Sequence, residues 1–301
     1  MQINNNMDSY DCQVSKILRK TAIKKRQNES IIQWLNSEKQ ERAAVQVQNC
    51  ATSLGITDID GIARVVRADF CRERICAVCA WRRQVRFVAQ TTPILDYMSE
   101  HGYQFIFATV TVKNVSYNEL DKTLSLILKG FANLRHRAEI KRAWRGIIRS
   151  VELTYNENNN TFHPHIHMLI AVDKSYYESS YISQARLSEL WRDCINADYI
   201  PVVDIRRVND TERAAVESLK YSLKPTVNPT ALSAFYYILK GRRLISFTGI
   251  FKTLRTEFKL SDFENILTDD LPQGYKVRYS LYKLDCSGGL YKYYKDKELS
   301  I

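Results

Sequence analysis

Apolar and polar positions alternate along the chain with two different periods, which predict a mixture of helices and strands. Apolar residues at helical spacing predict helical stretches at residues 13–48 (one or two helices), 85–99, 118–138, 183–197 and 211–224. Runs rich in β-branched and aromatic residues predict strands at residues 103–113, 147–155, 162–172 and 202–208. An Asn-rich turn joins the second and third of these strands into a β-hairpin.

Proline marks the end of one predicted helix, and glycine marks a turn near the C-terminus. Pro225 ends the last predicted helix, because the residue before a proline is pushed out of the helical region. Beyond about residue 265, a strand at 275–284 turns at Gly288 and Gly289 and returns through residues 291–294. This pattern predicts a second β-hairpin, whose role does not follow from the sequence.

These elements together predict an α+β fold with a central antiparallel sheet flanked by helices. We expect four segments along the chain. They are a basic helical extension at 1–47, a cysteine-rich element with a helix at 48–100, a central domain at 101–255 and a C-terminal tail at 256–301.

The composition is that of an ordinary globular protein, with 301 residues of which 45% are hydrophobic. No run approaches the roughly 18 apolar residues of a membrane-spanning helix. The N-terminal residues lack the basic and then apolar plan of a signal peptide. We therefore expect a cytoplasmic protein with no membrane partner.

The chain is strongly basic, with a formal net charge of +11 and a pI near 9.2. Clustered Lys and Arg side chains gain affinity for phosphate backbones by releasing condensed counterions. Charge alone leaves DNA, RNA and acidic membranes open as partners. Two stretches supply much of it, residues 16–26 and 135–145, and each fits either a solvated helix face or direct phosphate contact.

Three of the five histidines lie close together on one predicted strand, at His163, His165 and His167. Side chains alternate between the two faces of a strand, so all three imidazoles emerge on the same face. Two imidazoles at this spacing can share one metal ion. Surface histidines that serve only as polar strand residues are the alternative.

The neighbouring strand offers a third ligand. If the hairpin closes symmetrically, Tyr155 pairs with Phe162, and Glu152 lies opposite His165 on the same face. Two neutral imidazoles and one carboxylate suit a divalent ion that keeps open positions for a substrate oxygen.

A second pattern lies on the predicted helix 211–224, where Glu217, Tyr221 and Lys224 are spaced to line one face. A phenol ionises at about pH 10, so a tyrosine nucleophile needs its developing charge stabilised. Lys220 or Lys224 could supply part of that stabilisation. An amphipathic helix with a partly buried tyrosine explains the same spacing without catalysis.

Seven cysteines without an export signal argue against a disulfide framework and favour metal binding where they cluster. Cys76 and Cys79 form a Cys-x-x-Cys knuckle, Cys71 precedes Cys76 by five residues, and Cys50 completes four thiolates for a structural zinc ion. Free buried cysteines are the alternative. The zinc ion would hold in one shape the arginines that we expect to contact DNA, namely Arg72, Arg74, Arg82 and Arg83.

At this point the chain resembles the HUH endonucleases, and within them the plasmid rolling-circle replication (Rep) proteins with a single catalytic tyrosine. The resemblance covers about residues 48–255. The segments that carry it are the cysteine pattern from Cys50 to Arg83, the strand Phe105–Val112, the histidine motif Phe162–Leu169, the motif Glu217–Lys224 and the segment Gly241–Phe251.

The resemblance implies an HUH-type central sheet and a division of chemical roles. His165 and His167 would bind Mn²⁺ or Mg²⁺ with Glu152 as third ligand. His163 adds a third imidazole in register, so a pair formed by His163 and His165 stays open. Tyr221 would attack the scissile phosphodiester, leaving a 3′-hydroxyl and a 5′-phosphotyrosine.

The resemblance also implies partners and a way to end the reaction. The substrate would be plasmid origin DNA, single-stranded or in a hairpin, and a host helicase and polymerase would assist. A lone tyrosine leaves the last cut without a second nucleophile. Glu217, one helical turn before Tyr221, could activate water for that cut as a general base.

Three alternatives use parts of the same pattern. An HUH-type transposase shares the chemistry and differs in its DNA. An iron oxygenase with two histidines and one carboxylate shares the ligand types, but it leaves the basic charge and the cysteines unexplained. A non-enzymatic zinc-dependent nucleic-acid-binding protein needs only the charge and the cysteines.

Overall fold

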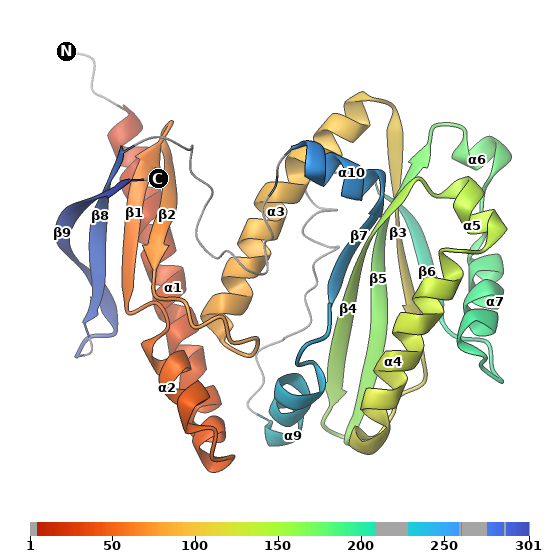
Figure 1. The fold of residues 1–301 in the computed structure, drawn as a ribbon, viewed down its shortest axis with the longest axis horizontal. Helices are drawn as coiled ribbons and strands as arrows, with labels where there is room; N and C mark the ends of the chain where they lie inside the picture. Colours follow the sequence, from red (N-terminus) through yellow and green to blue (C-terminus); the bar gives the residue numbers. More distant parts are fainter. Residues whose placement is uncertain (1–4, 209–227, 259, 261–275, 286, 301) are drawn as a thin grey trace. The chain divides into compact units, whose positions relative to one another are not determined.

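The fold is described from a computed structural model that covers residues 5–208, 228–258, 260, 276–285 and 287–300. The chain divides into two compact units (Figure 1). Unit 1 comprises Met1–Arg86 with Asp262–Ile301, and unit 2 comprises Phe87–Ser261. The division falls within helix α3 (Ala77–Glu100). The N-terminal region and the C-terminal tail thus belong to the same unit.

Unit 1 is built on a four-stranded antiparallel sheet to which both ends of the chain contribute. Its strand order is β2-β1-β8-β9. The strands are β1 (Ser53–Ile59), β2 (Ile62–Ala68), β8 (Lys276–Asp285) and β9 (Leu290–Ser300). The predicted C-terminal hairpin is confirmed, and it completes the sheet through antiparallel pairing of β8 with β1.

Helices α1 (Asn5–Ser37) and α2 (Glu41–Asn49) complete unit 1, where the sequence predicts one or two helices. The Gln13 side chain of α1 bonds the turn of the β1–β2 hairpin and strand β2, donating to the Gly61 carbonyl and accepting from the Ala63 amide, each at 3.0 Å. Leu54 and Ile56 of β1 are almost fully buried. One face of the sheet therefore packs against α1.

The β1–β2 hairpin was not predicted, although its turn has a recognisable signal. Asp60 and Gly61 both adopt positive φ, at 54° and 76°, which an Asp-Gly hairpin turn requires. A β-bulge beside Gly55 and Ile56 breaks the alternation of buried and exposed positions along the strands. Gly55 itself leaves room for the Tyr279 ring, which would lie 2.5 Å from an added Cβ.

Unit 2 has a five-stranded antiparallel sheet in the order β6-β3-β5-β4-β7. Its strands are β3 (Tyr103–Thr111), β4 (Gly146–Asn156), β5 (Thr161–Asp173), β6 (Val203–Val208) and β7 (Ile245–Gly249). The four strands predicted for this region are confirmed, and β7 lies within the segment 241–251 that carries part of the family resemblance. An α+β fold of antiparallel sheets and flanking helices is therefore correct.

Helices lie on both sides of this sheet (Figure 1). Among the described residues they are the part of α3 from Phe87 onward, α4 (Tyr117–Leu134), α5 (Ala138–Ala143), α6 (Tyr176–Ser179), α7 (Gln184–Ile195), α9 (Pro229–Ser233), the π-helix η1 (Ala234–Ile238) and α10 (Ile250–Glu257). Ser116 and Glu119 form a capping box that starts α4. The predicted helix 211–224 lies outside the described residues. Within the described ranges, none of the helices combines the length and hydropathy that a membrane-spanning helix requires.

The two faces of the unit 2 sheet differ in chemistry. Ile166, Met168 and Ile170 of β5 are fully buried on the face that α4 covers. The alternate residues of β5, beginning with His163 and His165, lie on the other face. Phe105 of β3 and Phe251 of α10 stack on that second face with ring centroids 6.4 Å apart.

The β4–β5 hairpin has the register that the sequence predicts. Tyr155 pairs with Phe162, and Glu152 pairs with His165. The Asn156 side chain accepts a hydrogen bond from the Asn158 amide at 3.0 Å, which closes the turn locally. This register places a carboxylate beside the imidazoles.

Candidate metal centre and cysteine cluster

Three side chains of types that can bind a metal ion meet on the face of the unit 2 sheet opposite α4. Glu152 projects from β4, and His165 and His167 project from β5. Their ligand atoms all lie within 4.8 Å of one another, and each residue is only 8% exposed. Two adjacent antiparallel strands therefore bring together two imidazoles and one carboxylate, as predicted from the hairpin register.

The three ligand atoms are spaced as the neighbours around one small cation would be. His165 Nε2 lies 3.0 Å from Glu152 Oε2, and His167 Nε2 lies 2.6 Å from the same oxygen. With metal–ligand distances of about 2.1 Å and octahedral angles, adjacent ligands are about 3 Å apart. The residues present fit a divalent ion such as Mn²⁺ or Mg²⁺.

The second nitrogen of each imidazole is held by another group. His167 Nδ1 is 2.9 Å from the Thr109 hydroxyl of β3, and His165 Nδ1 is 3.1 Å from the His163 carbonyl. When Nδ1 carries the proton and donates it to these oxygens, Nε2 keeps its lone pair for a metal ion. Thr109 was not identified from the sequence as part of this candidate site.

The electrostatics of the site keep Glu152 ionised. Burial raises the pKa of Glu152, but hydrogen bonds with His165 and His167 and the charges of these imidazoles outweigh it, lowering the pKa from 4.5 to about 2. A carboxylate that stays charged in a mostly buried position needs a positive partner. A divalent cation satisfies that need without protonating either imidazole.

His163 lies on the same face but outside the converging group. It pairs with Thr154, two residue pairs beyond the Glu152–His165 pair, and it is half-buried. Desolvation and the neighbouring His165 lower its pKa, which favours the neutral ring. Among the described residues, the atoms that converge near Glu152 come from His165 and His167 and not from His163.

An arginine and an aspartate border this polar face on strand β6. Asp204 pairs with Thr109, and Arg206 pairs with Phe107, so both side chains lie on the face that carries the histidines. The Arg206 guanidinium lies 5.1 Å from the Phe107 ring centroid, and the Phe107 and His167 rings are 5.5 Å apart. The predicted catalytic residues Glu217, Lys220, Tyr221 and Lys224 lie outside the described residues.

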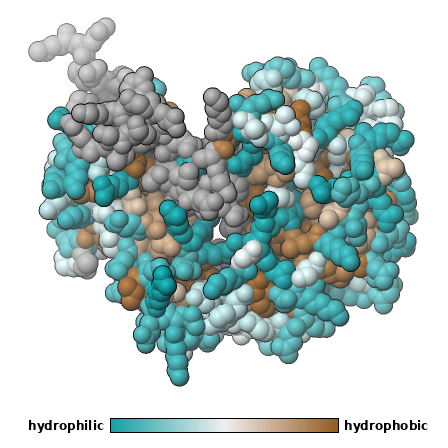
Figure 2. Space-filling model, viewed as in Figure 1, coloured by the Kyte–Doolittle hydropathy of each residue, from teal (hydrophilic) through white to brown (hydrophobic). Residues whose placement is uncertain are grey.

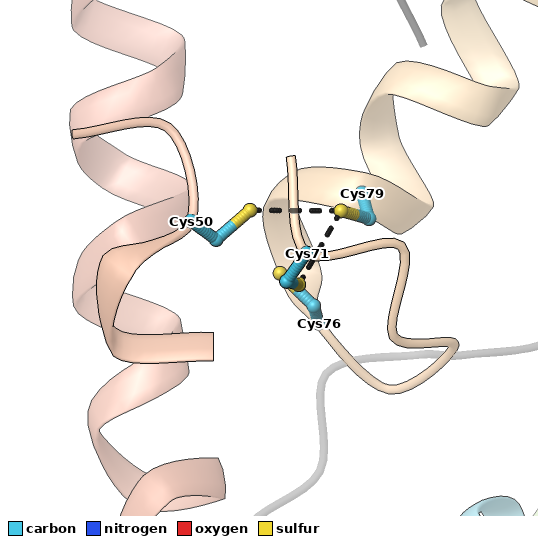
Figure 3. A group of neighbouring side chains, drawn as sticks. All are labelled: Cys50, Cys71, Cys76 and Cys79. Carbon is cyan, nitrogen blue, oxygen red and sulfur yellow. Dashed lines mark hydrogen bonds between the residues drawn. The ribbon is translucent and has the colours of Figure 1, made fainter. Parts of the chain in front are cut away.

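A second group of ligands lies in unit 1, where four cysteine sulfurs point toward one another (Figure 3). Cys50 follows α2, while the other three belong to the segment that leads into and begins α3. All four sulfurs lie within 4.8 Å of one another. Cys79 Sγ is 3.5 Å from Cys50 Sγ and 3.6 Å from Cys71 Sγ.

The surroundings of the cluster favour a negative charge on one sulfur, that of Cys76. The Asn28 amide donates to Cys76 Sγ at 3.3 Å, and the Lys25 ammonium donates to the Cys50 carbonyl at 2.6 Å. Burial raises the pKa of Cys76, but hydrogen bonds from Cys50, Cys71 and Cys79 outweigh it and leave that pKa well below its usual range. Hydrogen bonds to the neighbouring sulfurs raise the pKa of Cys50 and of Cys79, which favours the thiol form of these two side chains in the metal-free protein. Four thiolates this close together would require a cation to offset their charge, and this donor set fits Zn²⁺.

The four arginines that were expected to contact DNA have unequal environments. Arg72 is exposed and Arg74 is half-buried, whereas Arg82 and Arg83 are buried at 4% and 8% exposure. Arg83 donates to the Arg72 carbonyl. DNA contact by these four arginines stays a prediction.

Comparison with known proteins gives matches across most of the chain. The family model Rep_1, described as "Replication protein", matches residues 62–282. A "Protein rep" of Streptococcus pneumoniae serotype 2 (strain D39 / NCTC 7466) is 36% identical over 234 residues, covering 73% of this chain and 73% of the relative.

Two further relatives extend this result to other bacteria. A "Protein rep" of Bacillus sp is 34% identical, covering 68% of this chain and 76% of the relative. A "Protein rep" of Staphylococcus aureus is 29% identical, covering 69% of this chain and 93% of the relative. No solved structure matches the chain significantly.

Proposed function

Because the chain belongs to the Rep_1 family of replication proteins, we propose that it initiates plasmid rolling-circle replication by nicking and rejoining one strand of the plasmid origin. The observation that carries the proposal is the convergence of Glu152, His165 and His167 on one sheet face. A structural role alone does not require two imidazoles to point their Nε2 atoms at one carboxylate oxygen in a mostly buried position.

Glu152, His165 and His167 would hold the Mn²⁺ or Mg²⁺ ion of this reaction. When bound, such an ion stabilises the negative charge that grows on the phosphoryl and leaving oxygens during phosphodiester cleavage. Thr109 and the His163 carbonyl hold the two imidazoles in the orientation that leaves Nε2 available. These contacts reduce the reorganisation that ligand binding would otherwise need.

Tyr221 is the proposed nucleophile. Its phenolic oxygen attacks the scissile phosphorus, the bond to the 3′-oxygen breaks, and that oxygen takes up a proton to become the 3′-hydroxyl. The protein is left with a 5′-phosphotyrosine, while the phenolic proton passes to a base. Lys220 and Lys224 would stabilise the phenolate, and a host polymerase would extend the 3′-hydroxyl while a host helicase unwinds the duplex.

The reverse attack, by a 3′-hydroxyl on the phosphotyrosine, rejoins the strand. Termination requires a further cut, for which the chain has one proposed tyrosine nucleophile. We assign Glu217 as the general base that activates water for this cut. Zinc at the cysteine cluster would be structural, because four thiolates leave no open position for a substrate.

The proposal is tested by cleavage of labelled single-stranded DNA from the plasmid's own origin, with full-length protein and Mn²⁺. We expect a free 3′-hydroxyl fragment and a protein-linked 5′ fragment, and we expect EDTA to prevent both. His165→Ala and His167→Ala should abolish cleavage, while the matched control His163→Ala should retain it.

Three results would contradict this proposal. Cleavage that persists in EDTA would remove the metal from the reaction. Loss of cleavage in His163→Ala alone, with His165→Ala active, would mean that the ligands are not those whose atoms converge. Origin binding without any cleavage would favour a non-enzymatic DNA-binding protein.

A further inference from the structure

Strand β9 forms an edge of the unit 1 sheet and carries two adjacent exposed tyrosines. Tyr293 is 58% exposed and Tyr294 is 51% exposed. The proposed nicking chemistry uses neither residue. The pairing of β8 with β9 has a bulge between Leu281 and Tyr282, which are paired with Lys295 and Tyr293. Tyr294 is the extra residue of this bulge, so the two neighbouring rings lie in different surroundings.

Tyr293 lies on the face of the sheet that packs against α1. It pairs with Tyr282, and the two rings meet edge to face at 6.1 Å. The pKa of Tyr10 in α1 is raised to about 12, mainly by desolvation and then by the nearby Tyr282, Asp58, Asp11 and Asp296. The sheet face around Tyr293 is therefore acidic and lies close to α1.

Tyr294 has the opposite electrostatic environment. The Lys283 ammonium lies 3.7 Å from its ring centroid, and the Lys295 ammonium lies 5.3 Å from it. Lys292 pairs with Lys283 across the two strands and is also exposed. A solvent-exposed aromatic ring thus stands among three lysines on the sheet face that points away from α1.

The same face carries further basic residues. From the strand registers, they are Lys297 of the hairpin and Arg64 and Arg67 of β2. Two carboxylates at its margin already have partners, since Asp285 pairs with Lys292 at 2.6 Å and Asp69 accepts from Ser53 at 2.6 Å. Cations gather on this face, whereas Asp58 and Asp296 lie on the α1 side. The visible part of the hairpin surface is mostly hydrophilic (Figure 2).

We propose that the Tyr294 face of the β8–β9 hairpin binds single-stranded DNA, with the Tyr294 ring stacking on a base and Lys283 and Lys295 contacting phosphates. An exposed aromatic ring stacks more readily on unpaired bases than on a duplex, since paired bases already stack on their neighbours. Lysines around the ring supply the electrostatic attraction that tracks a phosphate backbone. This surface belongs to unit 1, whereas the candidate metal ligands belong to unit 2. The inference rests on the proposed function only in taking single-stranded DNA as the substrate.

The test measures binding of the full-length protein to a 20-nucleotide oligo(dT) and to a duplex of the same length, in EDTA so that no cleavage occurs. Tyr294→Ala should weaken oligo(dT) binding by about 5- to 150-fold, the range for loss of one base–aromatic stack. Tyr294→Phe should retain binding. Tyr293→Ala, the neighbouring exposed ring on the α1 side, is the matched control and should bind as the wild type does.

The salt dependence tests the lysines independently of the ring. Lys283→Gln and Lys295→Gln should each reduce the slope of log affinity against log salt by roughly 0.7, as expected for one lost phosphate contact on a single strand. Lys252→Gln, an exposed charge on α10 in unit 2, changes the net charge equally and should leave the slope unchanged.

Equal binding by Tyr294→Ala and Tyr293→Ala would overturn the proposal, as would an unchanged salt slope in both lysine variants. Duplex binding that falls as much as oligo(dT) binding in Tyr294→Ala would also overturn it, because stacking on an unpaired base would then not be the cause. None of these outcomes bears on Mn²⁺-dependent nicking. Conversely, the Tyr221→Phe variant should lose nicking but should bind oligo(dT) as the wild type does.

Discussion

Replacing Thr109 with valine tests whether the hydroxyl that holds His167 is part of the metal centre. Valine keeps the shape and the β-branching of threonine on strand β3 but removes the oxygen that lies 2.9 Å from His167 Nδ1. The imidazole then loses the contact that keeps Nε2 directed at Glu152, 2.6 Å away. We expect weaker metal binding with little change in the fold.

The size of the effect follows from the kind of contact that is lost. Removing a group that orients a metal-ligating histidine lowers metal affinity by about 10- to 100-fold. This range corresponds to about 1.4–2.7 kcal/mol of binding free energy. The loss of one neutral hydrogen bond should cost about 0.5–1.5 kcal/mol of folding free energy, so the variant should stay folded.

Strand β3 supplies a matched control. Thr111 lies two residues further along on the same face, and its hydroxyl donates to the Val202 carbonyl at 2.8 Å instead of to a histidine. Titration calorimetry with Mn²⁺ should show the loss of affinity in Thr109→Val and not in Thr111→Val. The Mn²⁺ concentration for half-maximal nicking should rise by the same factor, while the rate at saturating Mn²⁺ should recover.

Equal Mn²⁺ affinities for wild type and Thr109→Val would refute the reasoning. So would an equal loss in both threonine variants, because the effect would then come from the strand and not from the histidine contact. A nicking rate that stays low at saturating Mn²⁺ would assign Thr109 a role other than orienting a ligand.

Three further predictions concern the cysteine cluster, the charge of Glu152 and termination. Purified wild-type protein should contain one zinc ion per chain, and Cys76→Ser should lose the zinc and have a lower Tm. Substitution of the exposed Cys12 by Ser should change neither the zinc content nor the Tm. Wild-type protein without zinc would contradict the assignment of this site. Because folding lowers the pKa of Glu152 from 4.5 to about 2, its ionised form stabilises the metal-free protein above pH 4.5, and this contribution is lost as pH falls toward 2. The unfolding free energy of wild type minus that of Glu152→Gln, measured in EDTA, should therefore shrink over that window, and a difference that grows on acidification would show the opposite sign. Glu217→Ala should leave first-strand nicking nearly intact but slow hydrolytic release by about 10²- to 10⁴-fold, giving products longer than one plasmid unit in cells; unit-length products would assign termination to another residue.

The sequence predicted the centre of the site because the information is local. One short Asn-rich turn fixes the register between Glu152 and His165, and alternation along β5 then places His167 on the same face. Thr109 could not be found in this way. Its pairing with His167 is set where β3 meets β5, and α4 and β4 separate these strands along the chain, so no tight turn determines the register.

The sequence analysis missed half of the unit 1 sheet for a different reason. The bulge at Gly55 and Ile56 leaves both Val65 and Val66 buried, so the period of two on which strand prediction depends is interrupted. The C-terminal hairpin was found from its own alternation, but its pairing with β1 joins segments far apart in sequence. The burial of Arg82 and Arg83 was also not predictable, because long charged side chains are usually exposed.

The most direct test of the central claim is to trap the covalent adduct and identify the residue that carries it. Wild-type protein is incubated with single-stranded origin DNA and Mn²⁺, digested with protease and nuclease, and analysed by mass spectrometry. We predict a peptide with a nucleotide linked through its 5′-phosphate to Tyr221, and no adduct in Tyr221→Phe or when EDTA is present. A linkage to another residue, or cleavage to a free 5′-phosphate with no adduct at any time, would contradict the account.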